Sequence, residues 1–284
     1  MFFGYLQILY YLCGMKEMVS HIISELHGFY SEAEARELAY WIIEQQTGMT
    51  RTDVLMGRPK QLIQDLSHIL HQLKCHMPIQ YIFGVSEWRG LQLQVNQHTL
   101  IPRPETAELV DWIATTNSCS GPLRVMDIGT GSGCIAIALK KHCPAWHVQG
   151  VDISAEALKV AKNNAVKNAV DIVWKQMDIL SEKPDSQDII VSNPPYICHR
   201  EKASMQPRVL DYEPHSALFV PDDDPLLFYR RIASIKSAKR LYFEINEAYG
   251  QEVCDMMQDL GYVDIQLKYD IYGKARMVFG RIEA

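Results

Sequence analysis

The sequence lacks the excess of positive charge that is typical of proteins built around long nucleic acids. Its 28 lysines and arginines are outnumbered by 34 aspartates and glutamates, which leaves a formal net charge of −6 at pH 7. Contacts between basic side chains and phosphates supply much of the affinity for DNA and RNA. The acidic balance therefore disfavours an enzyme dedicated to DNA or RNA, although it leaves room for a local basic patch.

Paired cysteine motifs are also missing. The chain has seven cysteines, an odd number, and no two of them are spaced as C-x-x-C. This pattern disfavours a disulfide framework and a zinc site, and reduced thiols fit a cytosolic protein. His71, Cys75 and His76 are neighbours in the sequence, but on one helix they would not all face one ion. We therefore expect no bound metal.

Long hydrophobic runs that could span a bilayer are absent as well. The apolar start at residues 1–15 is too short for a transmembrane helix, and it has neither a basic leading region nor a small-residue cleavage site. We expect a buried helix or an over-long start there, with Met15 and Met18 as alternative initiators. The composition, 48% hydrophobic and 22% charged, is ordinary for a globular chain, and 284 residues suffice for two domains.

The first part of the chain has helical periodicity, from about residue 5 to residue 85. Ser31 and Glu34 form a capping-box pattern at the start of a helix-forming run. Apolar residues recur at spacings of three and four in this run and in a second one at 60–75: Ala35, Leu38, Ala39, Ile42 and Ile43, then Leu62, Ile63, Leu66, Ile69, Leu70 and Leu73. We expect these helices to pack as a small bundle.

A joint follows at residues 87–104, where Leu91, Leu93 and Val95 alternate with glutamines as in a strand. Pro102 and Pro104 are expected to stop regular structure there. Beyond the joint, strands at 123–127, 146–152, 172–176, 188–191, 241–245, 263–268 and 277–282 are expected to alternate with helices at 135–141, 155–168, 225–237 and 251–260. This alternation predicts a mostly parallel sheet covered by helices on both faces, with ligands at the carboxyl ends of the strands.

A glycine loop follows the first of these strands, in the segment Asp127-Ile-Gly-Thr-Gly-Ser-Gly133. Its spacing, G-x-G-x-G with an acid two residues upstream, differs from the dinucleotide fingerprint G-x-G-x-x-G. It is the pattern of the S-adenosylmethionine fold, in which this loop faces the methionyl part. A purely structural glycine turn is the alternative.

Acidic residues end the next two strands. Asp152, followed by Ile153, can accept hydrogen bonds from two neighbouring ribose hydroxyls, and the alternative is a cap for the next helix. Asp178 can accept a hydrogen bond from an adenine amino group while Ile179 packs on the ring. The alternative for Asp178 is a solvated loop acid.

The fourth strand ends in Asn193-Pro194-Pro195-Tyr196, the sharpest signal in the chain. The nitrogen of an amide or aromatic amine is a poor nucleophile because its lone pair is delocalised. Asn193 offers a side-chain carbonyl and Pro194 a backbone carbonyl to its NH2, and the prolines preset the loop. Tyr196 offers an aromatic face, and no strong general base is required. These residues predict methyl transfer to a planar amide or amino nitrogen, with a proline-rich turn and a packed tyrosine as the alternative.

With these residues assembled, the chain resembles the protein-(glutamine-N5) methyltransferases of peptide chain release factors, a family known as PrmC or HemK. The resemblance covers nearly the whole chain and is also carried by segments 78–84, 100–106, 213–218 and 270–276. There are departures from the family pattern. Ala107 stands where the family usually has Glu, Asn246 stands where Gly is usual, and residues 93–97 differ from the common F-x-V-x-P.

The resemblance implies a Rossmann-like class I methyltransferase sheet at 106–284, an N-terminal helical bundle that docks the substrate at 1–86, and a β-hairpin linker at 87–105. It implies S-adenosylmethionine as cofactor, with S-adenosylhomocysteine as product. The implied methyl acceptor is the glutamine of the Gly-Gly-Gln motif in class I release factors, with a role in translation termination and a cytoplasmic location. We expect a monomer with no nucleic-acid substrate and no membrane partner.

Residue by residue, the resemblance and the pattern assign roles to two sets of side chains. The expected cofactor-binding residues are Asp127, Gly129, Thr130, Gly131, Ser132, Gly133, Asp152, Ile153, Asp178, Ile179 and Asn193. The expected substrate-binding residues are Asn193, Pro194, Pro195 and Tyr196, and of these Asn193, Pro194 and Tyr196 are expected to be catalytic.

Three other functions stay open. A sister enzyme methylates a glutamine of a large-subunit ribosomal protein, but its linker is usually Pro-Arg-Ser-Pro instead of the Pro-Arg-Pro-Glu-Thr found here. An adenine-N6 methyltransferase of DNA, or an enzyme of structured RNA, shares Asn-Pro-Pro-Tyr but usually brings a basic groove or a recognition domain. A binding protein that has lost activity is disfavoured by the intact loops. Arg200, Lys202 and Arg208 either meet a partner or form a solvated face.

Overall fold

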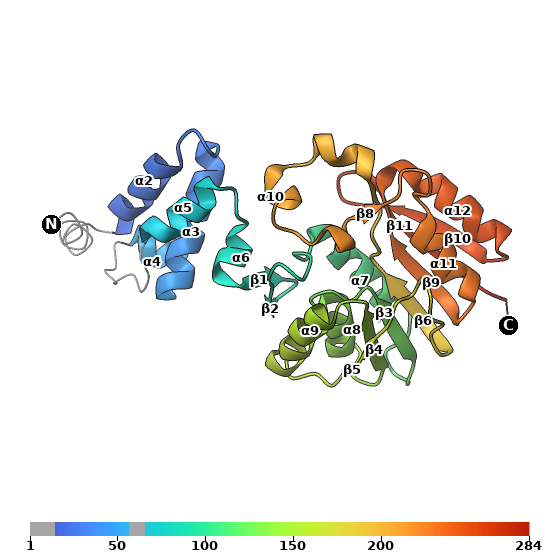
Figure 1. Cartoon of the computed structure of the whole chain (residues 1–284). Coiled ribbons are helices and arrows are strands. Elements are labelled where there is room, and N and C mark those ends of the chain that lie inside the picture. The colour runs from blue at the N-terminus through green and yellow to red at the C-terminus, as the bar shows by residue number, and fades with distance from the viewer. Residues whose placement is uncertain (1–14, 57–65, 284) are drawn as a thin grey trace. The chain divides into compact units, whose positions relative to one another are not determined.

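The computed structural model describes residues 15–56 and 66–283. The chain divides into two compact units, Met1–Phe83 and Gly84–Ala284 (Figure 1). The apolar start at 1–14, and Leu62 and Ile63 of the second expected helical run, lie outside the described residues. Within the described part, no helix is both long enough and apolar enough to cross a membrane.

The first unit is a small helical bundle, as the periodicity predicts. Its helices are α2 (Met15–Leu26), α3 (Glu32–Thr47), α4 (Arg51–Leu55), α5 (Leu66–Lys74) and α6 (Ile79–Phe83). The capping box of α3 is confirmed, because the Glu34 backbone N–H donates to the Ser31 hydroxyl and the Ser31 N–H donates to the Glu34 carboxylate. Ile22, Ile42 and Leu73 are fully buried in the core that these helices share.

A β-hairpin opens the second unit. Strands β1 (Val85–Trp88) and β2 (Leu91–Gln94) pair antiparallel around Arg89 and Gly90, both of which have positive φ. The expected alternation is confirmed, since Leu91 and Leu93 are buried and the glutamines between them are exposed. The helical pattern was expected to continue to residue 85, but α6 ends at Phe83 and β1 begins two residues later.

The rest of the second unit is built on a seven-stranded sheet with the order β10-β11-β9-β6-β3-β4-β5. Its strands are β3 (Arg124–Ile128), β4 (His147–Asp152), β5 (Val173–Gln176), β6 (Gln187–Ser192), β9 (Ala238–Glu244), β10 (Val263–Tyr269) and β11 (Ala275–Arg281). From β5 to β9 the pairing is parallel, and β11 is antiparallel to both neighbours. The predicted mostly parallel sheet is confirmed, and its switch point lies between β3 and β6.

Helices cover both faces of this sheet, because its strands alternate apolar side chains between two cores. Val125, Ile189 and Tyr242 lie in the core beneath α7 (Pro104–Thr116), α8 (Cys134–His142) and α9 (Ala155–Lys167). Met126 and Phe243 lie in the core beneath α11 (Leu227–Ile235) and α12 (Gly250–Asp259). The layered order of helices, sheet and helices follows from this alternation.

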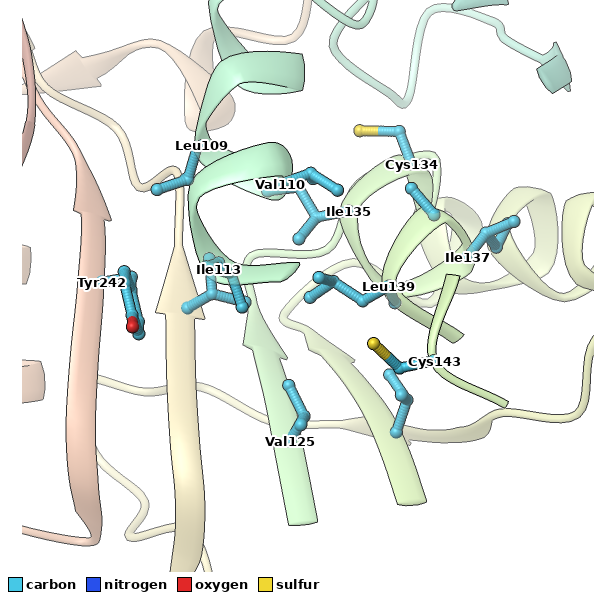
Figure 2. Packing of buried hydrophobic residues seen from close by; sticks show 14 of the residues in the cluster. Leu109, Val110, Ile113, Val125, Cys134, Ile135, Ile137, Leu139, Cys143 and Tyr242 are labelled. Atoms are coloured by element: carbon cyan, nitrogen blue, oxygen red, sulfur yellow. The ribbon is translucent and has the colours of Figure 1, made fainter. Parts of the chain in front are cut away.

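Figure 2 shows the first of these cores from close by. Val110 and Ile113 extend from α7, and Ile135 and Leu139 extend from α8, above Val125 of β3. All of these side chains are at most 4% exposed. The packing fixes where α8 begins, and therefore fixes the glycine loop that precedes it.

Helix α7 is the main element that the sequence analysis missed. Pro104 was expected to stop regular structure, but it is the first residue of this helix, and Arg103 before it is extended. Proline is well tolerated there, because the N–H of a first helical residue has no hydrogen-bond partner within the helix. The φ that the proline ring fixes is also already helical. The expectation held only for Pro102, which lies outside regular structure.

The segment after β6 consists of short pieces that no periodicity indicated. They are β7 (Ile197–Cys198), the 3-10 helix η1 (His199–Ser204), α10 (Pro207–Leu210), the 3-10 helix η2 (His215–Ala217) and β8 (Phe219–Val220), and a 3-10 helix η3 (Glu247–Tyr249) follows β9. Strands β7 and β8 pair parallel with each other. This segment returns the chain to the edge of the sheet where the expected site residues lie.

A disulfide joins Cys119, after α7, to Cys143 at the end of α8. The expectation of reduced thiols is therefore wrong for this pair, because only the packing of α7 on α8 brings the two residues together. With His142 they form the one group of three possible metal ligands in the described part of the chain. Two sulfurs that are bonded to each other are not available to a metal ion.

Candidate active site

One cavity opens at the carboxyl ends of β3, β4, β5 and β6. Ten of the expected site residues line it: Gly129, Thr130, Gly131, Ser132, Asp152, Ile153, Ile179, Asn193, Pro194 and Pro195. The other four, Asp127, Gly133, Asp178 and Tyr196, are not among the lining residues of the cavity. All of the lining residues belong to the second unit.

The glycine loop leaves β3 in a left-handed conformation, with φ of +70° at Gly129, +54° at Gly131 and +82° at Gly133. Such φ values favour glycine. Gly133 has a second reason to be glycine, because a Cβ there would lie 3.0 Å from Cη2 of Trp174. A Cβ on Gly131 would meet nothing within 4 Å, so that position faces open space.

Asp127 ties this loop to the first turn of α8. Its Oδ2 accepts hydrogen bonds from the Thr130 hydroxyl at 2.6 Å and from the Ala136 N–H at 3.3 Å. Burial raises the pKa of this carboxyl to about 7. Within the described residues, Asp127 Oδ1 and Ser132 Oγ are buried without hydrogen-bond partners. Acceptor capacity is therefore left over beside the loop.

Asp152 receives one backbone donor on each carboxylate oxygen. The Gly131 N–H donates to Oδ2 and the Ser154 N–H donates to Oδ1, both at 2.9 Å. Each oxygen keeps a second acceptor position for a ligand hydroxyl. The side-chain cap of α9 is Ser154, which accepts from the Ala157 N–H at 3.1 Å. Burial raises the pKa of Asp152.

The segments that follow β4 and β5 supply apolar side chains to the cavity. Ile153 is 59% exposed and Leu180 is 40% exposed, and both line it together with Ile179. The Asp178 carboxylate instead forms hydrogen bonds within its own turn, where it accepts from the Leu180 N–H at 2.9 Å and from the Ser181 hydroxyl at 3.0 Å. The apolar groups fit the faces of a flat ring. A role for Asp178 toward an adenine amino group stays a prediction.

The Asn193–Tyr196 loop is held from several sides. Ser192 at the end of β6 donates its hydroxyl to the Ile128 carbonyl at 2.7 Å, which ties this strand end to β3. The backbone N–H of Tyr196 donates to the Leu218 carbonyl, and Nδ2 of Asn246 donates to the Tyr196 carbonyl at 3.2 Å. The loop is therefore fixed before any ligand binds. The Tyr196 ring packs against the core beneath α11 and α12, where burial raises the pKa of its phenol.

Behind Asn193 lies a polar pair that the sequence analysis did not assign to the site. Nδ2 of Asn193 donates to Oγ1 of Thr106 at 3.4 Å, and the Thr106 hydroxyl donates to Oε2 of Glu244 at 2.7 Å. Burial raises the pKa of Glu244 to about 7. The only sequence signal was that Thr106 lies in a segment carrying the family resemblance and that Glu244 lies near the end of the strand expected at 241–245.

A second missed contact closes the cavity on the side of residues 213–218. Arg103 forms an ion pair with Glu213 at 2.6 Å, and the Glu213 side chain is 2% exposed. Burial raises the pKa of this carboxyl, while the Arg103 guanidinium favours its charged form. The pair brings Pro214 and Ser216 to the cavity wall, which Arg103 also lines.

These groups fit S-adenosylmethionine, judged by the chemistry of the available donors and acceptors. Its ammonium needs acceptors, and Ser132 Oγ is a buried acceptor of the glycine loop at the cavity wall. Its ribose hydroxyls need a carboxylate such as Asp152, and its adenine needs apolar faces such as Ile153 and Ile179.

Two family models match the chain. The PrmC N-terminal domain matches residues 17–84, and the Methyltransferase small domain matches residues 108–211. A methyltransferase from Pyrococcus furiosus has a TM-score of 0.51 at 14% identity, covering 77% of this chain and 100% of that one. A human methyltransferase 10 domain containing protein has a TM-score of 0.52 at 17% identity, covering 68% of this chain and 90% of that one. These structures show the methyltransferase fold.

Close relatives in sequence match over almost the full length. A release factor glutamine methyltransferase of Flavobacterium psychrophilum is 42% identical over 278 residues, covering 93% of this chain and 98% of that protein. One of Bacteroides thetaiotaomicron is 42% identical over 276 residues, covering 93% of this chain and 99% of its own length. Together with the matching domain models, this similarity shows that the chain belongs to the family of release factor glutamine methyltransferases.

Proposed function

We propose that this protein transfers a methyl group from S-adenosylmethionine to the side-chain amide nitrogen, N5, of the glutamine in the Gly-Gly-Gln motif of class I peptide chain release factors. The observation that carries the proposal is that the glycine loop and Asn193-Pro194-Pro195 line one cavity. The relatives named release factor glutamine methyltransferase support the class of substrate.

The proposed cofactor site is the half of the cavity around the glycine loop. When bound, S-adenosylmethionine supplies a methyl group activated by its sulfonium, and S-adenosylhomocysteine is the product. Residues Gly129–Gly133 would face the methionyl part and Asp152 the ribose. Ile153 and Ile179 would face the adenine, with Asp178 as the predicted acceptor for its amino group. Since the loop is already held by Asp127 and Asp152, little reorganisation is needed for binding.

The proposed substrate site is the Asn193–Tyr196 loop. The Asn193 side-chain carbonyl and the Pro194 backbone carbonyl would accept hydrogen bonds from the substrate NH2, which orients its lone pair toward the methyl group. The two prolines keep these acceptors preset. The amide nitrogen would form the new C–N bond as the methyl carbon–sulfur bond breaks, with the bonding electron pair left on the sulfur of S-adenosylhomocysteine. The nitrogen would then release a proton to water, so no strong base has to act before the transfer. An aromatic face of Tyr196 toward the flat substrate group stays a prediction, since this ring packs against the core beneath α11 and α12.

We extend the proposal to the arrangement of the whole chain. Residues 1–86 would dock the release factor, and residues 106–284 would bind the cofactor and catalyse the transfer. Residues 87–105 would link these two parts of the chain. The protein would act in the cytoplasm, because its proposed substrate works in translation termination. We expect it to act as a monomer and to have no nucleic-acid substrate.

The experiment that tests this function offers the purified protein radiolabelled S-adenosylmethionine and three acceptors. These are an unmodified class I release factor, the same factor with its Gly-Gly-Gln glutamine changed to alanine, and duplex DNA. We expect label on the unmodified factor alone. Label on the alanine form would place the acceptor elsewhere in the factor, and label on DNA would move the protein to the base-modifying enzymes.

The residue that the function depends on most is Asn193, which we would change to alanine. We expect Asn193→Ala to lower kcat by about 100-fold, since it removes a preset polar group needed at the reacting nitrogen. The matched control is Asn163→Ala, at an exposed asparagine of α9 away from the cavity. Unchanged turnover in Asn193→Ala, measured with the same labelled substrate, would contradict the proposed chemistry.

A further inference from the structure

The side-chain amide of Asn193 is held by a chain of buried hydrogen bonds that runs through Thr106 to Glu244. We call Thr106 and Glu244 the relay. Thr106 lies in the first turn of α7 and is 2% exposed, and Glu244 is the last residue of β9 and is 1% exposed. Oγ1 of Thr106 is 2.7 Å from Oε2 of Glu244 and 3.4 Å from Nδ2 of Asn193. Thr106 therefore stands between a carboxyl group and the amide at the cavity wall.

The direction of these hydrogen bonds follows from the number of available protons. An ionised carboxylate can only accept, so Thr106 must give its single hydroxyl proton to Glu244. The Thr106 oxygen can then only accept from Asn193, and the group facing it must be the NH2 side of the amide. Oδ1 is left as the end of the Asn193 amide that is directed away from the relay. Asn193 also lines the cavity.

We propose that Thr106 and Glu244 are positioning residues that hold the Asn193 amide with its oxygen toward the substrate nitrogen. This inference rests on the proposed function and deepens it, because an amide turned by 180° would present a donor where an acceptor is needed. Neither residue touches the reacting atoms in this scheme. Both act by keeping one of the two possible orientations of Asn193.

The groups around Glu244 determine the pH range in which its carboxyl is ionised and can hold Thr106 in this way. The groups that face it from the neighbouring elements are Thr106, Glu105, Arg103, Cys134, Arg276, Tyr196 and Tyr229. Burial raises the pKa of Glu244 to about 7, against the Thr106 hydrogen bond and the Arg276 charge, which favour the ionised form. Glu105 favours the neutral form. The relay therefore changes its protonation in the neutral pH range.

When Glu244 is protonated, the hydrogen bonds of the relay no longer have to run from Asn193 through Thr106 to Glu244. A neutral carboxyl can donate to Thr106, which frees the Thr106 proton for the oxygen of Asn193 and allows the amide to turn over. The fraction of correctly oriented Asn193 should therefore fall as the pH falls through about 7. Glu244→Gln imitates the neutral form at every pH, because its NH2 group donates to Thr106.

The test measures kcat, and KM for the release factor, between pH 6 and pH 8.5 in wild type, Thr106→Val, Thr106→Ser and Glu244→Gln. We expect Thr106→Val to lower kcat about 10-fold with little change in KM, because it removes orientation and leaves ground-state contacts in place. Thr106→Ser should restore most of the loss, since it keeps the hydroxyl. Glu244→Gln should lose the rise in kcat with pH that wild type shows.

Binding of S-adenosylhomocysteine, measured by calorimetry, separates this role from misfolding. All three variants should bind it within about three-fold of the wild type. Although Thr106 lines the cavity, the hydrogen bonds that hold the glycine loop and Asp152 involve neither Thr106 nor Glu244. Full kcat in Thr106→Val, or a wild-type pH profile in Glu244→Gln, would overturn the positioning role and leave the proposed function intact. Failure of the wild type to label the glutamine would overturn both.

Discussion

At the scale of single residues, the glycine loop shows that one motif can need glycine for different reasons. At Gly131 only the backbone conformation requires it, because a Cβ would meet nothing within 4 Å. At Gly133 the conformation is combined with close packing, since a Cβ would lie 3.0 Å from Trp174 and 3.2 Å from Ala161. The first position belongs to the cavity and the second to the core.

This difference predicts an order of stability among alanine variants. Gly131→Ala should lower the free energy of unfolding by about 1 kcal/mol, the cost of a left-handed conformation for a residue with a Cβ. Gly133→Ala should cost clearly more, because its Cβ also displaces Trp174. Gly121→Ala, with open space and no positive φ, is the control and should stay within about 0.5 kcal/mol of wild type. Urea unfolding of the four proteins measures the order, and equal losses at positions 131 and 133 would contradict the packing argument.

The buried carboxyl of Asp127 predicts a dependence of stability on pH. Its pKa is raised from 3.8 to about 7, so between these values the folded protein binds more protons than the unfolded chain. Stability should therefore fall as the pH rises from about 4 to about 7, and the loss should be complete above the folded pKa. Asn is neutral at every pH, so Asp127→Asn should remove this component.

We expect the loss of unfolding free energy between pH 5 and pH 8 to be smaller in Asp127→Asn than in wild type by roughly 2 kcal/mol. Denaturant titrations at several pH values measure it. Glu244 titrates in both proteins and cancels in the comparison. Asp171→Asn, at an exposed position, is the matched control and should follow the wild-type curve. Parallel curves for wild type and Asp127→Asn would show that this carboxyl does not titrate as described.

The candidate site was predictable from the sequence only where its residues end strands. The glycine loop, Asp152 and Asn193 lie at the ends of β3, β4 and β6, and parallel strands bring their carboxyl ends to one edge. Thr106 and Glu244 meet across 138 residues of sequence, and no local pattern joins the end of a linker to the end of a distant strand. Such partners are set by tertiary packing alone.

At the scale of elements, the strands and helices of the sheet were predictable because each is long enough to show its period. Helix α7 was missed because Pro104 suggests a break as much as a helical start. The segment from β7 to β8 was missed for another reason. Its elements are two to six residues long, and such lengths carry no periodic signal.

One departure from the family pattern, Asn246, lies between β9 and the short helix η3. Its side chain caps η3 by accepting from the Ala248 N–H at 3.0 Å, and its Nδ2 donates to the Tyr196 carbonyl at 3.2 Å. The same Nδ2 is 3.3 Å from a carboxylate oxygen of Glu201 in η1. A single side chain thus connects the end of β9 to the substrate loop and to the segment after it.

Replacing Asn246 by glycine should therefore lower stability by about 1–3 kcal/mol, because the cap and the hydrogen bonds to two segments are lost together. Asn246→Ser keeps an oxygen for the cap but does not reach Tyr196, so it should retain part of the difference. Urea unfolding compares the three proteins. If the serine variant matches wild type, the link to Tyr196 contributes nothing, and if both variants match wild type, the whole connection is dispensable.

At the scale of the whole molecule, the candidate site lies within one of the two compact units. Every residue that lines the cavity lies between His98 and Ile232, whereas the helices α2 to α6 have a core of their own. A ligand that binds only the folded form stabilises what it contacts, by about 2.7 kcal/mol when its concentration is 100 times its Kd. The cofactor should therefore affect the two units unequally.

We predict that S-adenosylhomocysteine at this concentration slows amide hydrogen exchange at the ends of β3, β4 and β6 by up to about 100-fold, the exchange equivalent of that free energy. Exchange in α2, α3 and α5 should stay the same within error, because the ligand contacts nothing in that core. Mass spectrometry of peptides from one digest reports both regions in the same sample, so each serves as a control for the other. Equal protection of α3 and the glycine loop would mean that the two units unfold together, and protection of neither would contradict the cofactor site itself.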